Sequence, residues 1–418
     1  MDPSSKIDGV MDILIEEGKI VSVAKDIKRE DSQVLNASGK VVIPGLIDIH
    51  THLREPGRED EETIRTGSRA AAKGGFTSIC CMANTAPCVD NQGMVEFIYS
   101  ESKKVGLVNV YPIGAVTKGL AGKELAEIGE LKRSGIVAIS DDGNPILNSE
   151  IMRRAFEYSK MFGIPVISHC EDKSLSSDGV MNEGYVSTLL GLRGMPPVAE
   201  SVMVARDIQL AETTGASLHI AHVTCAHSIN IIREAKKRGV KVSCEVTPHH
   251  FTLTEEAVQG FNTNAKMNPP LRTKDDMDAI KEGLRDGTID AIASDHAPHT
   301  ENEKDVEFDS APFGVIGLET SLSLTIMELL DKGILTLSQL VEKMSANPAR
   351  ILGLKKGSLG IGSDADITVI DINSKWVVDK SKLESKSKNS PFIGWGLKGM
   401  ATEVIVGGKI IIRDGKII

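Results

Sequence analysis

The sequence predicts an α/β protein, a (β/α)8 barrel of the TIM type with a small β-sandwich formed by its N- and C-terminal segments. Short apolar runs alternate with longer stretches of helical period, which is typical of repeated βα units. Segments of β type flank this alternating region at both ends. We predict the N-terminal part of the sandwich at 1–45, the barrel at 46–352 and the C-terminal part of the sandwich at 353–418.

The terminal segments predict the sandwich. Residues 12–24 predict two short strands around a turn at 17–19, and 41–43 predict a third strand closed by Pro44 and Gly45. Near the other end, 366–370 predict a strand, and 402–418 predict a hairpin that turns at Gly407 and Gly408. The simplest packing joins the two ends of the chain in one β module.

Eight apolar runs between these ends predict the barrel strands. They are 46–54, 77–83, 108–116, 136–142, 165–171, 217–224, 241–250 and 290–299. The predicted helices are 60–74, 91–104, 123–134, 149–162, 197–214, 226–238 and 274–286, with two more at 319–331 and 336–346. A doubly wound open sheet is the alternative. It predicts a glycine-rich phosphate loop after the first strand, and the sequence has none, so the barrel is favoured.

Composition narrows the class of protein. The net charge is -10, aromatic residues make up 4%, and Lys and Arg form no cluster. These values argue against nucleic acid or an anionic membrane as a partner. The sequence has no apolar run of membrane-spanning length and no signal-type core in its first 20 residues, so we expect a cytoplasmic protein.

Histidine and aspartate gather where the predicted strands end. Nine of the ten histidines lie at these ends, and only His227 does not. The carboxyl ends of parallel barrel strands share one rim, where active sites are built. Histidines that only fill a core would be scattered along the strands. The pattern therefore predicts a metal site at this rim.

The ligand chemistry suits zinc or a similar divalent ion in an open, catalytic site. Five candidate ligands share this rim: His50, His52, His169, His222 and Asp295. Five is more than one tetrahedral metal uses, so two metals with a bridging carboxylate fit better. Asp141 and Asp142 are both candidates for the bridge, because strand alternation lets only one of them point inward.

Three donors lie beside the candidate ligands. Arg54, Asn84 and His299 together could hold a carboxylate. A role for Asn84 as a turn residue in Asn-Thr-Ala-Pro is equally compatible with the sequence.

Five motifs carry a family resemblance. They are His50-Thr-His-Leu-Arg-Glu-Pro-Gly57, Asp141-Asp-Gly143, Ser168-His-Cys-Glu171, Met267-Asn-Pro-Pro-Leu-Arg272 and Ser294-Asp-His-Ala-Pro-His299. They resemble the signatures of type I bacterial dihydroorotases in the amidohydrolase superfamily, and the resemblance covers nearly the whole chain. It implies reversible cyclisation of N-carbamoyl-L-aspartate to L-dihydroorotate and water in the de novo biosynthesis of UMP.

The resemblance also implies roles for individual residues. It makes His50, His52 and Asp295 ligands of one zinc and His169 and His222 ligands of another, with Asp142 rather than Asp141 as the bridge. One or two zinc ions per subunit are expected, and Asp295 is the expected acid and base beside a metal-activated hydroxide. The substrate-binding residues it implies are His52, Arg54, Asn84, Asn268, His299, Phe313 and Gly314.

Many relatives bridge their metals with a carboxylated lysine, but the 136–142 run has no lysine, so Asp142 must serve. Two alternatives remain: a hydantoinase or allantoinase, and an inactive scaffold for aspartate transcarbamoylase. A hydantoinase or allantoinase handles neutral rings and would not need Arg54. An inactive scaffold would have lost ligands. We expect a small-molecule substrate and a homo-oligomer, with aspartate transcarbamoylase as a candidate partner.

Overall fold

The computed structural model describes residues 1–29 and 31–418, and its centre is a ring of parallel strands. Three strands form one arc, β4 (Leu46–Thr51), β5 (Phe76–Cys81) and β6 (Asn109–Pro112). Four form the other, β7 (Val166–Ser168), β10 (Leu218–Ile220), β11 (Val242–Val246) and β12 (Ala291–Ile292). A parallel bridge between Thr51 and His296 joins the arcs on one side.

The other junction runs through the 136–142 segment, where the prediction of a regular strand was wrong. Only Ile139 forms bridges there, to Gly114 on one side and Val166 on the other. Both neighbouring segments carry a proline, Pro112 and Pro165, at this level. Proline has no N–H to donate, so the ladder is interrupted. The segment still occupies the fourth position of the barrel.

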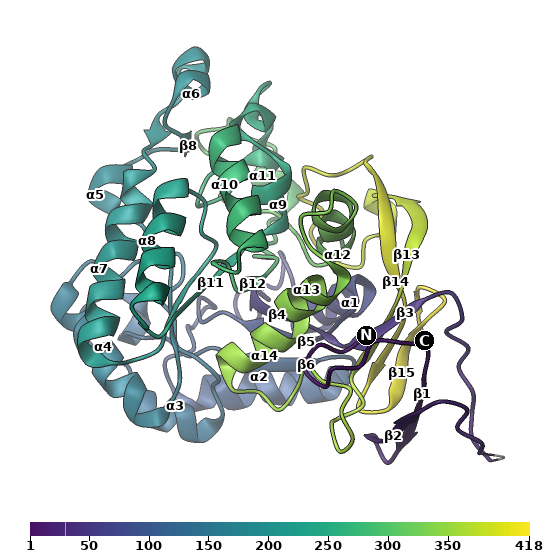
Figure 1. Ribbon diagram of the computed structural model, residues 1–418. Helices are drawn as coiled ribbons and strands as arrows, with labels where there is room; N and C mark the ends of the chain where they lie inside the picture. The colour runs from purple at the N-terminus through teal and green to yellow at the C-terminus, as the bar shows by residue number, and fades with distance from the viewer. Residues whose placement is uncertain (30) are drawn as a thin grey trace.

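Helices follow the strands as predicted and cover the outside of the ring (Figure 1). They are α1 (Ile64–Gly74), α2 (Gln92–Val105), α3 (Ile128–Ser134), α4 (Ser149–Phe162), α7 (Val198–Thr214), α8 (Ala226–Lys237) and α10 (Lys274–Arg285). The two further predicted helices each continue into a π-type turn, with α12 (Ser321–Thr325) leading into 326–330 and α13 (Leu337–Val341) into 342–346. After them comes α14 (Asn347–Leu352).

The terminal segments form two sheets. β1 (Asp12–Glu16) and β2 (Lys19–Ala24) make an antiparallel pair. The larger sheet has the order β16-β15-β14-β13-β3, so that β3 (Val41–Pro44) pairs with β13 (Ile367–Val377). The remaining strands are β14 (Gly396–Val406), β15 (Lys409–Arg413) and β16 (Lys416–Ile417).

Apolar side chains from both sheets share one core cluster, which includes Ile20 of β2 and Ile367, Val369 and Ile405 of the larger sheet. The sandwich therefore unites distant parts of the chain, and the two termini lie close together in Figure 1. Gly75 ends α1 at the junction with the larger sheet. It has a φ of 93°, and a Cβ at this position would lie 3.0 Å from that of Ala401.

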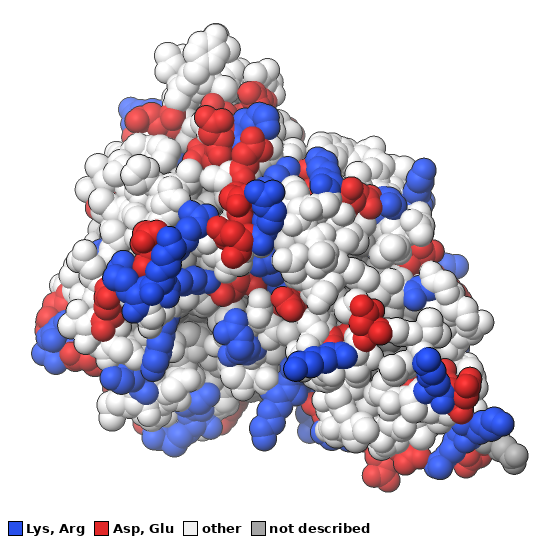
Figure 2. Space-filling model, in the orientation of Figure 1, with Lys and Arg blue, Asp and Glu red and all other residues white. Residues whose placement is uncertain are grey.

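The surface carries mixed charge. Figure 2 shows Lys and Arg interspersed with Asp and Glu over the visible face. Within 1–29 and 31–418, no helix is long and apolar enough to cross a membrane.

Candidate active site

Six buried side chains converge at the carboxyl ends of the barrel strands. They are His50, His52, Asp142, His169, His222 and Asp295. His50 is the last but one residue of β4, and the others follow the ends of barrel strands or the Ile139 bridge. The topology thus brings residues from five separate segments to one point on the rim.

The first group of side chains surrounds His50 and His52. Their Nε2 atoms each lie 3.5 Å from Oδ2 of Asp142. The same two nitrogens lie 3.4 and 3.1 Å from Oδ1 of Asp295. Two imidazoles and two carboxylates therefore face a common centre.

The second group lies on the other side of Asp142. Nδ1 of His169 and Nε2 of His222 lie 3.6 and 3.4 Å from its Oδ1, and 2.9 Å from each other. Asp142 therefore presents one oxygen to each group, and both groups have the spacing that could hold a metal ion. Asp141 faces away, because its carboxylate accepts N–H groups of Val116 and Thr117 at 2.7 and 3.1 Å.

The electrostatics of the cluster depend on these close approaches. Burial alone would raise the pKa of Asp142, but the close imidazoles of His50, His169 and His222 hold it well below its ordinary value. Burial would lower the pKa of His50, and Asp142, Asp295 and Glu245 raise it well above its ordinary value instead. Without metal, the imidazoles and carboxylates stabilise each other's charged forms.

The donor set fits a divalent metal. Nε2 of His50 and Oδ1 of Asp142 are both buried, and neither has a hydrogen-bond partner among the described residues. A buried polar atom without a partner is costly, and a ligand removes that cost. Imidazole nitrogens and carboxylate oxygens are the ligands that Zn²⁺ takes in catalytic sites.

Three residues of the site have strained backbones. Arg54, His222 and Asp295 have φ values of 61°, 32° and 47°, which residues other than glycine rarely adopt. Each such conformation costs on the order of 1–3 kcal/mol and persists only where the surroundings enforce it. The three strained residues lie where a strand ends and a loop begins, and their side chains point towards the site.

Two carboxylates that the sequence analysis missed orient the imidazoles. Glu245 of β11 lies 2.6 Å from Nδ1 of His50 and 3.1 Å from Nε2 of His219. The carboxylate of Glu171 lies 3.1 Å from Nε2 of His169, and it accepts a hydrogen bond of 2.9 Å from Nδ2 of Asn268. A detectable signal existed for Glu245, because a glutamate in the middle of a buried apolar strand needs a partner.

The predicted substrate residues fall into two sets. Asn84 and Asn268 adjoin the imidazoles, since Oδ1 of Asn84 lies 2.8 Å from Nδ1 of His52 and Asn268 bonds Glu171. Arg54 and His299 both contact the buried carboxylate of Glu61. Nε of Arg54 lies 3.1 Å from this carboxylate, and Nδ1 of His299 lies 2.6 Å from it. Sequence reasoning did not identify Glu61.

The backbone at 313–314 adjoins the second of these sets, Arg54 and His299. Nε2 of His299 lies 2.8 Å from the carbonyl of Phe313, and the N–H of Gly314 donates to Lys266 at 2.9 Å. Nearby, Nε2 of His250 lies 2.9 Å from the carbonyl oxygen of Pro269, and Nε2 of His296 lies 3.1 Å from the carboxylate of Glu62.

Comparison with known proteins first places the chain among the amidohydrolases. A family model described as "Amidohydrolase family" matches residues 219–412, and one described as "Dihydro-orotase-like" matches 39–228. The L-hydantoinase (dihydropyrimidinase) of Arthrobacter aurescens has a TM-score of 0.88 and 26% identity, covering 98% of this chain and 93% of that one. The dihydropyrimidinase of Brevibacillus agri, at 24% identity, TM-score 0.83 and coverage of 98% and 92%, shows the fold alone.

The sequence relatives define the family more narrowly. A dihydroorotase from Geobacter metallireducens is 57% identical over 414 residues, which cover 99% of this chain and 97% of the relative. One from Pelotomaculum thermopropionicum is 58% identical over 403 residues, or 96% and 94% of the two chains. The chain belongs to the dihydroorotase family. The (β/α)8 fold and the family predicted from the sequence are thereby confirmed.

Proposed function

We propose that this protein catalyses the reversible cyclisation of N-carbamoyl-L-aspartate to L-dihydroorotate and water, with one or two zinc ions per subunit. The reaction belongs to pyrimidine biosynthesis. The observation that carries the proposal is the pair of imidazole groups sharing Asp142, with the partly buried guanidinium of Arg54 close by. Full-length similarity to dihydroorotases supports it.

The ligand assignment follows the two groups. His50, His52 and Asp295 would hold one zinc, His169 and His222 would hold the other, and Asp142 would contact both. A divalent metal, when bound, acidifies water to a pKa of about 7 and polarises a carbonyl oxygen. Glu245 and Glu171 would keep the His50 and His169 rings oriented towards the metals.

Asp295 is the proposed acid and base. Burial would raise its pKa, but His50 and His52 hold the pKa below its ordinary value, so the carboxylate is ionised and able to accept a proton. In ring opening it would take the proton of the attacking water and deliver it to the leaving ring nitrogen. In cyclisation the same transfers run in reverse.

Arg54 and His299 would bind the carboxylate of the substrate, together with Asn84, Asn268 and the 313–314 backbone. Arg54 is held by Glu61 and by the carbonyl of Pro298 at 3.2 Å, so its position is set before substrate arrives. Hydantoin and allantoin carry no carboxylate. This anion site therefore favours dihydroorotate over the neutral rings. An inactive scaffold is disfavoured because all six predicted ligand positions carry a histidine or an aspartate.

The test is ring opening of L-dihydroorotate by zinc-loaded protein, measured beside hydantoin and allantoin at equal concentration, with bound metal counted by atomic absorption. We expect turnover of dihydroorotate only, and one or two zinc ions per chain. Faster turnover of a neutral ring would refute the substrate assignment. Absence of turnover from protein with verified zinc would refute the enzymatic assignment.

A further inference from the structure

The connection from β13 to β14 reaches back to the barrel. Residues 378–395, which we call the strap, lie beside α12 (Figure 1). Ser385 donates to the carboxylate of Glu62, and Ser387 donates to the carbonyl of Glu61 at 2.6 Å. The tip of the strap thus contacts the same rim segment that holds Arg54 and His299.

Asn389 makes the most extensive of these contacts and is only 4% exposed. Its Oδ1 accepts the N–H of His299 at 3.1 Å, and its Nδ2 donates to the carbonyls of Ala297 and Gly314, both at 3.1 Å. Its own carbonyl accepts the N–H of Ile316 at 3.0 Å. One residue of the strap therefore joins two rim loops, 297–299 and 313–316.

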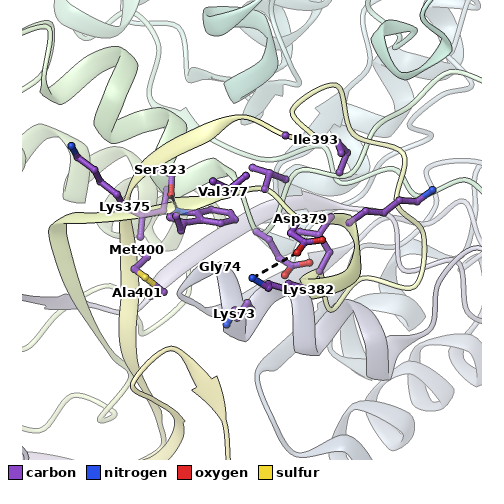
Figure 3. Close-up of a pocket in the computed structure, with 17 residues that line it drawn as sticks. Lys73, Gly74, Ser323, Lys375, Val377, Asp379, Lys382, Ile393, Met400 and Ala401 are labelled. Atoms are coloured by element: carbon purple, nitrogen blue, oxygen red, sulfur yellow. Dashed lines mark hydrogen bonds and ion pairs between the residues drawn. The ribbon is translucent and has the colours of Figure 1, made fainter.

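The two legs of the strap are held by apolar contacts, since Val378, Leu383 and Phe392 are buried in the main core. A cavity of about 760 Å³ lies between its two legs, the end of α1 and α12. Figure 3 shows Asp379 and Lys382 of the outgoing leg and Ile393 of the return leg around this hollow. The legs therefore depend on apolar contacts beside this cavity, whereas the tip is held at the rim by its polar contacts.

We propose that Asn389 is a positioning residue, which holds His299 and the 313–314 backbone where they meet the substrate. The inference rests on the proposed function. A planar amide supplies the one acceptor and two donors that these loops require. Aspartate would place an oxygen against two carbonyls, and alanine would remove all three bonds. The expected loss is therefore in substrate binding rather than in the chemical step.

The test compares the zinc-loaded wild-type protein with Asn389→Ala and Asn389→Asp. Ser390→Ala is the matched control, because Ser390 is also buried on the strap but its hydroxyl bonds, among the described residues, the N–H of Phe392 alone. We expect both Asn389 variants to raise KM for L-dihydroorotate about tenfold or more while kcat changes less than about threefold. Ser390→Ala should leave both constants unchanged.

A second measurement does not depend on activity. Amide hydrogen exchange by mass spectrometry should show faster exchange in peptides covering 297–299 and 313–316 in both Asn389 variants, and not in Ser390→Ala. If Asn389→Ala does not fold, Asn389→Asp, which keeps size and one acceptor, decides the matter.

An unchanged KM in a folded Asn389 variant overturns the inference, as does unchanged exchange in both loops. Failure of the wild-type protein to open dihydroorotate refutes the proposed function instead. If the wild-type protein opens another ring, the same KM comparison is made with that substrate. If it opens none, the exchange measurement alone decides whether Asn389 positions the loops.

Discussion

Replacing Glu245 with glutamine should weaken metal binding while leaving the barrel folded. The carboxylate lies between His50 and His219, at 2.6 and 3.1 Å from their ring nitrogens. Burial would raise the pKa of Glu245, but His50 and His219 lower it to about 2, so the group is an anion at neutral pH. It can therefore accept N–H from both rings and direct Nε2 of His50 towards Asp142.

The magnitude follows from that geometry. Glutamine has one acceptor oxygen, and its amide nitrogen would face the second ring as a donor. Loss of a partner that orients a metal ligand costs about 10- to 100-fold in metal affinity, equivalent to about 1.4–2.8 kcal/mol. Without metal, the loss of charged hydrogen bonds should also lower the free energy of unfolding by about 1.5–3 kcal/mol.

The assay is a competition titration, in which zinc is partitioned between the protein and a chromophoric chelator of known affinity. Glu200→Gln is the matched control, since Glu200 is equally buried but bonds Thr224 and Cys225. A zinc affinity for Glu245→Gln within about twofold of wild type would refute the reasoning, as would an equal loss in Glu200→Gln.

The remaining predictions concern turnover, substrate affinity and pH. Asp295→Asn should lower kcat by at least about 100-fold, because the proton acceptor is lost. Arg54→Met should raise KM about tenfold or more with a smaller effect on kcat, whereas Arg58→Met, which also removes a partner of Glu61, should change KM little. Glu319→Gln should gain stability relative to wild type as pH rises. Burial raises the pKa of Glu319 to about 7, although N–H groups of Glu384 and Ser385 oppose this rise. The protonated carboxyl therefore contributes to the stability of the wild-type protein in full below about pH 4.5, and this contribution is lost as the pH rises through 7. The full pKa shift corresponds to ~3 kcal/mol of unfolding free energy. Because Glu319 borders the open cavity, we expect the stability difference between the variant and wild type to change by about 2 kcal/mol between pH 5 and pH 8, measured by urea denaturation.

Each of these has a contradicting result. Asp295→Asn that retains more than about a tenth of wild-type kcat would exclude its acid–base role. An unchanged KM in Arg54→Met would exclude the anion site. Parallel stability profiles for wild type and Glu319→Gln across this pH range would show that Glu319 is ionised throughout.

The alternation of apolar runs and helical stretches was enough to predict the barrel, because strand and helix periods differ. The 136–142 segment shows the limit of that method. Its apolar pattern is that of a strand, but the interruption of its ladder depends on prolines in two neighbouring segments. Such a feature is visible only once the neighbours are known.

The candidate ligands could be found in the sequence because histidine and aspartate at several strand ends are uncommon. The choice between Asp141 and Asp142 could not be made from alternation, since it depends on which carboxylate meets the N–H groups of Val116 and Thr117. Glu61 and Asn389 were missed for a similar reason. Each is a common polar residue with a partner far away in sequence, which is His299 in both cases. The catalytic and binding roles of all these residues stay predictions.

The strap has a consequence for how the protein becomes active during synthesis. Chains emerge from the ribosome N-terminus first, so all eight barrel segments are made before the strap. The rim loops that Asn389 joins would then be incomplete in a nascent barrel. Full affinity for the substrate would be reached only after β13 has paired with β3 and the strap has returned to the rim, so that a low KM reports a finished chain.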